Sequence, residues 1–389
     1  MWRIWPVLSG FLRATLTSVM NIHRPFNILQ IIFLTVLCFA YPVDCISERI
    51  KIGISTPLTG DGSPYGIDIR NGIILANSRL SNDAYELVIE DEKSPKDAVS
   101  IAQKFIGIDK IKYVLGPAVN ATLFSAGPVY DRAGVVCVGL GTSGDQKGIG
   151  TNLFRIYPAD QESANILGPW VYDRYSKIGI VSDQDEYTAL IERTLVSVNQ
   201  VRSSPRELFI EQDGSKATDY VPLFLRVKSR GIDALVLNPA TEQGFIRMVK
   251  QLASAGIKVP IFTFVLPSSS TVQSALGELL NNIIYADLPE LNELLSKDGK
   301  LVMEDFKKRF GEPNSVPLIA ALGYESFRIL DEAIKSGKSV PEYLRGLKVE
   351  DSIIGRYSFD DDGAVQGINF SLLQIHVVNG KIEKSPVQR

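Results

Sequence analysis

Short apolar segments alternate with segments of helical periodicity along most of the chain, and this alternation restricts the possible folds more than any other sequence feature. The expected strands form two series: residues 50–55, 85–90, 112–116 and 135–139, then, after a break, residues 177–182, 207–211, 234–237, 260–264 and 282–286. Short, near-continuous apolar strands separated by helices are typical of parallel sheets covered on both faces. The two series therefore predict an α/β fold with two doubly wound parallel-sheet lobes.

The C-terminal region adds helices and a few strands that are too short to form a domain of their own. Helical patterns cover residues 301–310 and 318–334. Late strands are expected at residues 357–359 and 373–378, and Asn379-Gly380 after the second is a hairpin turn signal. These elements must therefore pack onto the two lobes.

The simplest packing returns the chain to the first lobe near residue 288 and to the second near residue 367. We expect lobe 1 to contain residues 50–155 and 288–366, and lobe 2 to contain residues 156–287 and 367–389. Three crossing segments would then form a hinge. In open α/β sheets ligands bind beyond the C-terminal ends of the strands, so we expect the ligand cleft between the lobes.

The first 40 residues have the composition of a targeting segment. No Asp or Glu precedes Asp44, three arginines are the only Lys or Arg residues before Arg49, and residues 28–40 are almost entirely apolar. This pattern is typical of a secretory signal peptide, and the apolar run is shorter than the roughly 20 residues that span a membrane. We expect residues 1–40 to be removed and the mature protein to be periplasmic. An uncleaved anchor and translation from Met20 are the alternatives.

Composition excludes several classes of function. Without residues 1–40 the chain has 38 basic and 44 acidic side chains, so it lacks the basic excess that favours nucleic acid or an anionic membrane. Two histidines exclude a histidine-rich metal site, and three cysteines without a C-x-x-C motif exclude a disulfide framework. We expect no metal and no cofactor. Cys137 is expected to be buried, and Asp44 before Cys45 disfavours a lipid anchor there.

Five segments together resemble the Leu/Ile/Val-binding type of periplasmic binding protein. They are residues 50–76 (IKIGISTPLTGDGSPYGIDIRNGIILA), 113–117 (YVLGP), 131–135 (DRAGV), 255–262 (AGIKVPIF) and 355–370 (GRYSFDDDGAVQGINF). The resemblance covers the chain from Ile50 onward. It implies the type I periplasmic binding protein fold, with two lobes joined by a three-segment hinge. It also implies a non-enzymatic, monomeric protein that captures a small carboxylate or amino acid for the permease of an ABC importer.

The resemblance assigns binding positions in two loops of the first lobe. Asn120 stands where relatives usually have Ser, at a strand end before a helix, where backbone N–H groups favour anions. Gly141, Thr142 and Ser143 match the loop that holds a ligand carboxylate. A helix cap at Asn120 and a plain turn at residues 139–144 are the alternatives.

The resemblance also assigns residues that would close the cleft. Tyr65 matches a pocket tyrosine of the first lobe and Tyr187 an aromatic of the second, although both could be packing aromatics. Ala240 and Phe264 fall on two further ligand-contacting positions. A ligand favours the closed state only by contacting both lobes in that state, so the pair Tyr65 and Tyr187 would serve closure.

The chain departs from the family at the position that binds the ligand ammonium. Relatives commonly have Glu near the end of the strand at residues 261–264, whereas Phe264, Val265 and Leu266 fill that region here. A buried ammonium without a counter-charge costs several kcal/mol. Asp183, Asp185, Glu186 and Glu242 are the possible substitutes. The sequence therefore favours a small carboxylate that lacks an amine over a standard α-amino acid.

Other functions find less support. The sequence G-x-G-x-x-G at residues 139–144 follows the fourth strand and precedes a poor helix, unlike a dinucleotide fingerprint. A Ser-His-Asp hydrolase would depend on His376, in an expected strand, and no G-x-S-x-G occurs. Residues 360–363 resemble half a calcium loop without its terminal Glu and are interpreted as a turn. A ligand-sensing subunit of a membrane receptor remains an alternative to transport.

Overall fold

A computed structural model of the chain describes residues 49–141, 149–214 and 218–387. Residues 49–389 form one compact unit. The expected signal peptide, Cys45, Thr142 and Ser143 lie outside the described residues. Within the described ranges, no helix is both long enough and apolar enough to cross a membrane.

The first sheet is entirely parallel. Its strands are β1 (Ile50–Thr56), β2 (Tyr85–Asp91), β3 (Tyr113–Leu115), β4 (Val136–Gly139) and β5 (Leu153–Arg155), in the order β2-β1-β3-β4-β5. The connections are helical: α3 (Ser63–Leu80), α4 (Pro95–Lys104) with the π-helical turn η1 (Phe105–Asp109), and α5 (Asn120–Arg132). Ser94 caps α4 by accepting a hydrogen bond from the Asp97 N–H at 3.2 Å, as the Ser-Pro sequence there predicts.

The second sheet has seven strands in the order β15-β14-β10-β9-β8-β6-β7. They are β6 (Lys177–Gln184), β7 (Glu207–Gly214), β8 (Ala234–Asn238), β9 (Ile261–Phe264), β10 (Ile284–Asp287), β14 (Ser371–Val378) and β15 (Lys381–Pro386). The helices of this lobe are α6 (Asp160–Arg174), α7 (Glu186–Gln200), α8 (Val221–Ser229), α9 (Glu242–Ser254) and α10 (Ser270–Leu276), with the 3₁₀ turns η2 (Leu266–Ser268) and η3 (Gly277–Leu280). Strand β14 runs antiparallel to β10 and pairs with β15 through the expected Asn379-Gly380 turn, where both residues have positive φ.

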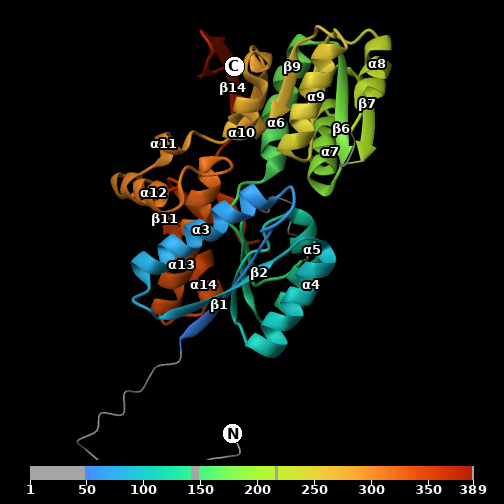
Figure 1. Cartoon of the computed structure of the whole chain (residues 1–389). Helices are drawn as coiled ribbons and strands as arrows, with labels where there is room; N and C mark the ends of the chain where they lie inside the picture. Colours follow the sequence, from blue (N-terminus) through green and yellow to red (C-terminus); the bar gives the residue numbers. More distant parts are fainter. Residues whose placement is uncertain (1–48, 142–148, 215–217, 388–389) are drawn as a thin grey trace, which may run out of the picture. The chain divides into compact units, whose positions relative to one another are not determined.

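Each sheet buries both of its faces, as expected for a doubly wound fold. Along β8, Leu235 and Leu237 point into the core on the α8–α10 side, whereas Ala234 and Val236 point into the core on the α6–α7 side. Successive side chains of a strand alternate between faces. A strand that is apolar on both faces therefore needs helices on both, and Figure 1 shows helices flanking this sheet.

The segment after β10 packs onto the first lobe. It forms α11 (Leu291–Leu294), α12 (Lys297–Phe310), α13 (Pro317–Lys335), α14 (Val340–Arg345) and a three-stranded sheet of β11 (Lys348–Val349), β12 (Tyr357–Phe359) and β13 (Val365–Gln366). Helix α13 lies against α3 (Figure 1). Two glycines without a Cβ allow the helix backbones to approach closely. A Cβ added to Gly72 would lie 2.2 Å from the Ala320 carbonyl oxygen, and one added to Gly323 would lie 2.3 Å from that of Ile69.

The chain thus crosses between the two sheets after β5, after β10 and after β13. We propose lobe boundaries at residues 155/156, 287/288 and 366/367. The sequence analysis did not anticipate α6. The buried face of α6 carries the small residues Ser163, Ala164 and Gly168, so the helix shows little apolar periodicity although it packs against α7.

Candidate functional site

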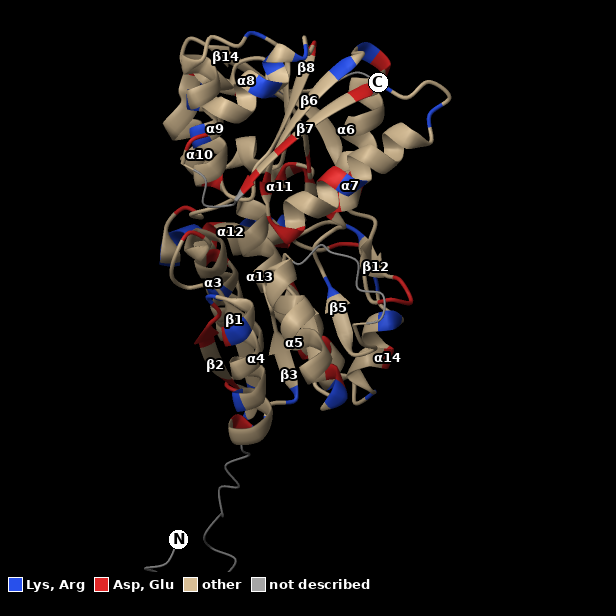
Figure 2. Ribbon diagram, turned by 90° about the vertical axis from the view of Figure 1, so that its right-hand side faces the viewer, with Lys and Arg blue, Asp and Glu red and all other residues tan. Residues whose placement is uncertain are grey.

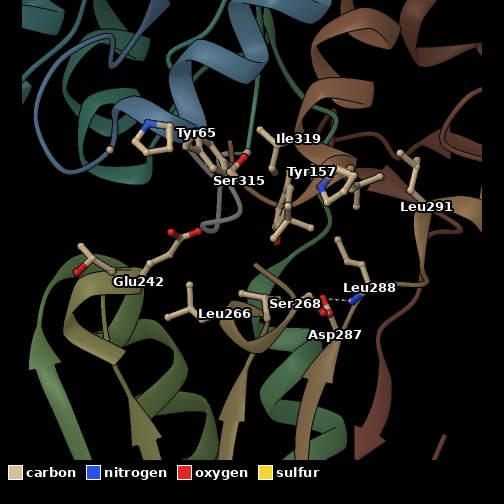
Figure 3. A pocket seen from close by; sticks show the side chains of 18 of the residues that line it. Tyr65, Tyr157, Glu242, Leu266, Ser268, Asp287, Leu288, Leu291, Ser315 and Ile319 are labelled. Atoms are coloured by element: carbon tan, nitrogen blue, oxygen red, sulfur yellow. Dashed lines mark hydrogen bonds between the residues drawn. The ribbon is translucent and has the colours of Figure 1, made fainter. Parts of the chain in front are cut away.

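A cavity of about 910 Å³ lies between the two lobes. Lobe 1 contributes the loop before α3, the first turn of α5 and the start of α13, and lobe 2 contributes the segments after β6, β8 and β9. The crossing segments supply Tyr157, Asp160 and residues 287–292. Figure 3 shows side chains from both lobes that point toward this space, and Figure 2 shows acidic positions on the ribbon where the lobes face each other. The volume is near the upper end of the roughly 300–1,000 Å³ of small-molecule sites.

Five of the eight predicted binding residues line this cavity. They are Tyr65, Asn120, Gly141, Tyr187 and Ala240. Thr142 and Ser143 lie outside the described residues, so their role stays a prediction. Phe264 requires a correction: it is only 2% exposed, packs in the core of lobe 2 and does not line the cavity. The strand ends there and the chain turns, so Val265 and Leu266 face the space instead.

The absence of a side chain at Gly141 leaves room for the Tyr65 hydroxyl. Gly141 has φ +79°, and a Cβ added to it would lie 1.6 Å from the Tyr65 hydroxyl oxygen. The resemblance leads to the expectation of Ser or Ala at this position, but either would collide with the Tyr65 ring in its observed position. The glycine therefore allows the tyrosine hydroxyl to reach the inner wall of the cavity.

A buried carboxylate, Glu92, holds the wall at the start of α5. Glu92 is 2% exposed and accepts hydrogen bonds from the Ala118 N–H at 2.8 Å, the Thr122 hydroxyl at 3.1 Å and the Ser55 hydroxyl at 2.6 Å. Burial raises its pKa to about 7, although these hydrogen bonds favour the charged form. Val119 is the N-cap residue of α5, so Asn120 stands inside the helix rather than in the capping position.

Asp160 is the most deeply placed acidic group of the cavity. It is the first residue of α6, 4% exposed, and within the described residues its carboxylate accepts no hydrogen bond. Burial raises the pKa of Asp160 to about 8, against the opposing effect of the Arg155 charge. The pKa values of Tyr65, Tyr157 and Tyr187 are raised first by burial and then by the Asp160 charge. Asp160 therefore lies within electrostatic range of tyrosines from both lobes.

Asp287, at the end of β10, is buried and well partnered. Its carboxylate accepts hydrogen bonds from the Ser268 hydroxyl and, at 2.8 Å, from the Leu288 N–H (Figure 3). Burial raises the pKa of Asp287 to about 7, and the Ser268 hydrogen bond and the Lys384 charge oppose this rise. Lys384 also forms an ion pair with Glu290 on the second crossing segment. This arrangement ties β15 to the hinge.

The sequence of the chain matches a known family over most of its length. A family profile described as "Periplasmic binding protein" matches residues 49–375.

The chain belongs to the periplasmic binding protein family.

The chain is similar to proteins of the leucine-binding type, and it has the type I fold of the solved structures. A curated relative, the Leu/Ile/Val-binding protein homolog 1 of Brucella abortus, is 22% identical over 81% of this chain and 87% of its own length. The solved structure of LivJ from Streptococcus pneumoniae, in complex with isoleucine, superposes with a TM-score of 0.73 at 22% identity, covering 88% of this chain and all of that one. A solute-binding protein of an ABC transporter from R. palustris, in complex with 4-hydroxybenzoate, has a TM-score of 0.76 at 17% identity, covering 88% and 96%.

Acidic side chains line the cavity of this periplasmic binding protein, although residues 264–266 at the end of β9 supply none. Of the four substitutes considered, Asp185 and Glu242 line the cavity, whereas Glu186 is exposed and Asp183 binds the Tyr220 hydroxyl and the Ala240 N–H. Asp185 caps α7 through the Tyr187 N–H at 2.9 Å. Asp160 and Asp287 were missed altogether. An Asp at a helix start would have been the signal for Asp160, but α6 itself was not anticipated.

The sequence motifs considered for other functions lie beside strands, in a strand or in a turn. The described elements on either side of the 139–144 motif are the strands β4 and β5, and residues 142–144 lie outside the described residues. His376 pairs across β14 and β15 with the Ser385 hydroxyl at 2.9 Å. Residues 360–363 form the turn between β12 and β13, where Asp360 accepts a hydrogen bond from the Ala364 N–H.

Proposed function

We propose that this protein captures a small amino-acid-like solute by closing its lobes over it and delivers the solute to the permease of an ABC importer. The observation that carries the proposal is the cavity between the lobes, with Tyr65 from α3 and Tyr187 from α7 on opposite walls. A ligand that touches both walls stabilises the closed state by differential contact. The names of the relatives support capture of a small acid or amino acid.

The proposal places the mature protein in the periplasm as a monomer that performs no chemistry on its ligand. Export rests on the basic and apolar pattern of residues 1–40, which predicts a signal peptide. Uptake of the labelled ligand should fall in a strain that lacks the chain and recover when the chain is restored. Unchanged uptake together with a lost transcriptional response would instead support a sensing subunit.

The electrostatics of the cavity favour a ligand that carries an ammonium as well as a carboxylate. Within the described lining there are two lysines, Lys307 and Lys384, against six carboxylates: Asp61, Asp160, Asp185, Glu242, Asp287 and Glu290. Even with the buried Asp160 and Asp287 protonated, four carboxylates would face two lysines, and this excess would repel an anion that carries no positive group. The first turn of α5 and the loop that begins at Gly141 would hold the ligand carboxylate. Asp160, buried and without a hydrogen bond from the described residues, would hold the ammonium.

Calorimetry with L-leucine and 4-methylpentanoate, which differ by the amine, tests this assignment on the chain from residue 41. We expect leucine to bind more tightly to the wild type, and Asp160→Asn to weaken leucine by about a hundredfold, the cost of leaving one partner of a buried pair unmatched. Asp361→Asn, an exposed position in the β12–β13 turn, is the matched control and should change nothing. Tighter binding of 4-methylpentanoate would contradict the ammonium site but not solute capture.

Proton linkage provides a second readout of the same site. Asp160 must be ionised to bind an ammonium, and its pKa in the free protein lies at about 8. Leucine affinity should therefore rise between pH 6 and pH 8 in the wild type and stay flat in Asp160→Asn. A flat wild-type profile would show that Asp160 does not contact the ligand.

A further inference from the structure

The cavity continues beyond the polar groups into a part that we name the apolar arm. It is formed by the second crossing segment, α11, α12 and the start of α13. The residues that line it are Leu288, Leu291, Leu295, Met303, Val316 and Ile319. In Figure 3, Leu291 lies on the opposite side of the view from Tyr65 and Glu242, with Leu288 and Ile319 between them. The arm therefore extends the cavity away from the cleft-closing tyrosine of lobe 1.

The walls of the arm are part of the core of lobe 1. Leu288, Met303 and Ile319 are 3–6% exposed and belong to one apolar cluster, with Leu295 and Val316 packed against it. Side chains held in a core cannot turn away from the cavity without leaving a void, so the apolar surface is preformed. Lys307 also lines the cavity, but it pairs with Glu312 at 3.0 Å.

A buried carboxylate fixes the loop at the entrance to α13. Asp68 is fully buried and accepts four hydrogen bonds: from the N–H and side-chain amide of Asn314, and from the N–H and hydroxyl of Ser315, at 2.7–3.0 Å. The loop carries Ser315 and Val316 to the cavity wall. This side of the arm is thus held by charge-assisted hydrogen bonds, and a bound group meets a rigid surface.

We propose that the apolar arm binds a side group larger than that of leucine, so that the preferred solute is an amphipathic amino acid with a long unbranched alkyl or aryl group. The inference rests on the proposed function, since it takes the polar end of the solute to lie at Asp160. A cavity of about 910 Å³ exceeds what a branched-chain amino acid fills. Six apolar side chains along one arm contribute transfer free energy only if the ligand reaches them.

A homologous ligand series tests the arm directly. Calorimetry would compare L-alanine, L-norvaline, L-leucine, L-2-aminooctanoate and L-homophenylalanine on the wild-type chain from residue 41. Each methylene buried in the arm should raise the affinity about fourfold, so that aminooctanoate and homophenylalanine bind more tightly than leucine. An affinity maximum at norvaline or leucine would overturn the inference while leaving solute capture intact. Failure of all five to bind would contradict the proposed function itself.

Two variants locate the effect. Leu291→Gln at the start of α11 and the half-buried Leu295→Gln should remove most of the gain for the two long ligands and leave alanine unchanged. Leu301→Gln, the same substitution at a position that is 50% exposed on α12 and outside the cavity lining, is the control. Thermal unfolding identifies any variant that fails to fold, and Leu295→Gln keeps the test valid if Leu291→Gln does. Unchanged slopes in the folded variants would overturn the assignment to the arm.

Discussion

Buried carboxylates lie around the cavity in two regions, which differ in the number of hydrogen bonds that these carboxylates accept. In the lobe 1 wall, Asp68 and Glu92 accept four and three hydrogen bonds, respectively. In the polar centre near the first crossing, Asp160 is as deeply buried but accepts none from the described residues. A carboxylate saturated with donors stabilises the fold, whereas one without them costs stability and is retained for another reason. Hydrogen-bond saturation thus distinguishes the structural carboxylates from the one that we propose to bind the ligand.

Removal of Asp68 should give the largest effect on stability. Asp68→Ala leaves the donors of Asn314 and of the buried Ser315 without an acceptor, and we expect the free energy of unfolding to fall by about 4 kcal/mol. Urea unfolding of the ligand-free protein measures it, with the exposed Asp61→Ala as the control. A loss of less than about 1 kcal/mol would mean that saturation does not identify the structural carboxylates.

Substitution of Asp160 should have the opposite effect and raise the free energy of unfolding. An unfolded Asp titrates near pH 4 and native Asp160 at about 8, so the native state binds the extra proton between these values and wild-type stability falls as the pH rises. Asn does not titrate. We therefore expect Asp160→Asn to stabilise the free protein by at least about 2 kcal/mol at pH 8 and by almost nothing at pH 4. Destabilisation at pH 8 would place Asp160 with the structural group.

The smallest effect should come from the contact between Gly141 and Tyr65, which borders the polar centre. Gly141→Ala combines a strained positive φ with a collision against the Tyr65 hydroxyl, so unfolding should become easier by about 1–2 kcal/mol. Gly134→Ala has a similar φ of +68° but no neighbour within 4 Å of the added Cβ, so it isolates the backbone cost. Equal losses in the two variants would show that Tyr65 moves aside freely.

The sequence anticipated the elements whose apolar pattern is strong and missed those whose pattern is weak. Strand β8 and helix α13 lie within one residue of the expected positions, because β8 is apolar on both faces and α13 has a long series of buried apolar residues. Strand β5 has only three residues, and α6 buries small side chains, so neither produced a period that could be recognised. Because α6 was not predicted, Asp160 at its first position was not recognised as a candidate either.

The residues of the candidate site also divide into those that the sequence anticipated and those that it did not. Positions that follow a strand in a recognisable segment, such as Tyr65, Asn120 and Gly141, could be assigned from resemblance, and the structure brings them to one cavity. Phe264 was misplaced because one residue decides which side of a strand end a side chain faces. The residues of the apolar arm lie between residues 288 and 319, and no local pattern distinguishes them from ordinary core residues.

The sequence by itself determined the α/β class, the two series of parallel strands and the family. Apolar periodicity and local turn chemistry are short-range properties that can be seen along the chain. The tertiary structure decided which carboxylates are saturated by donors and that the buried Asp160 faces the cavity without a donor from the described residues. The donors of Asp68 come from residues 246 and 247 positions away, and those of Glu92 from two separate segments, β1 and the start of α5. Such long-range hydrogen bonds set the charge and shape of the site, and they form only when distant segments of the chain are folded together.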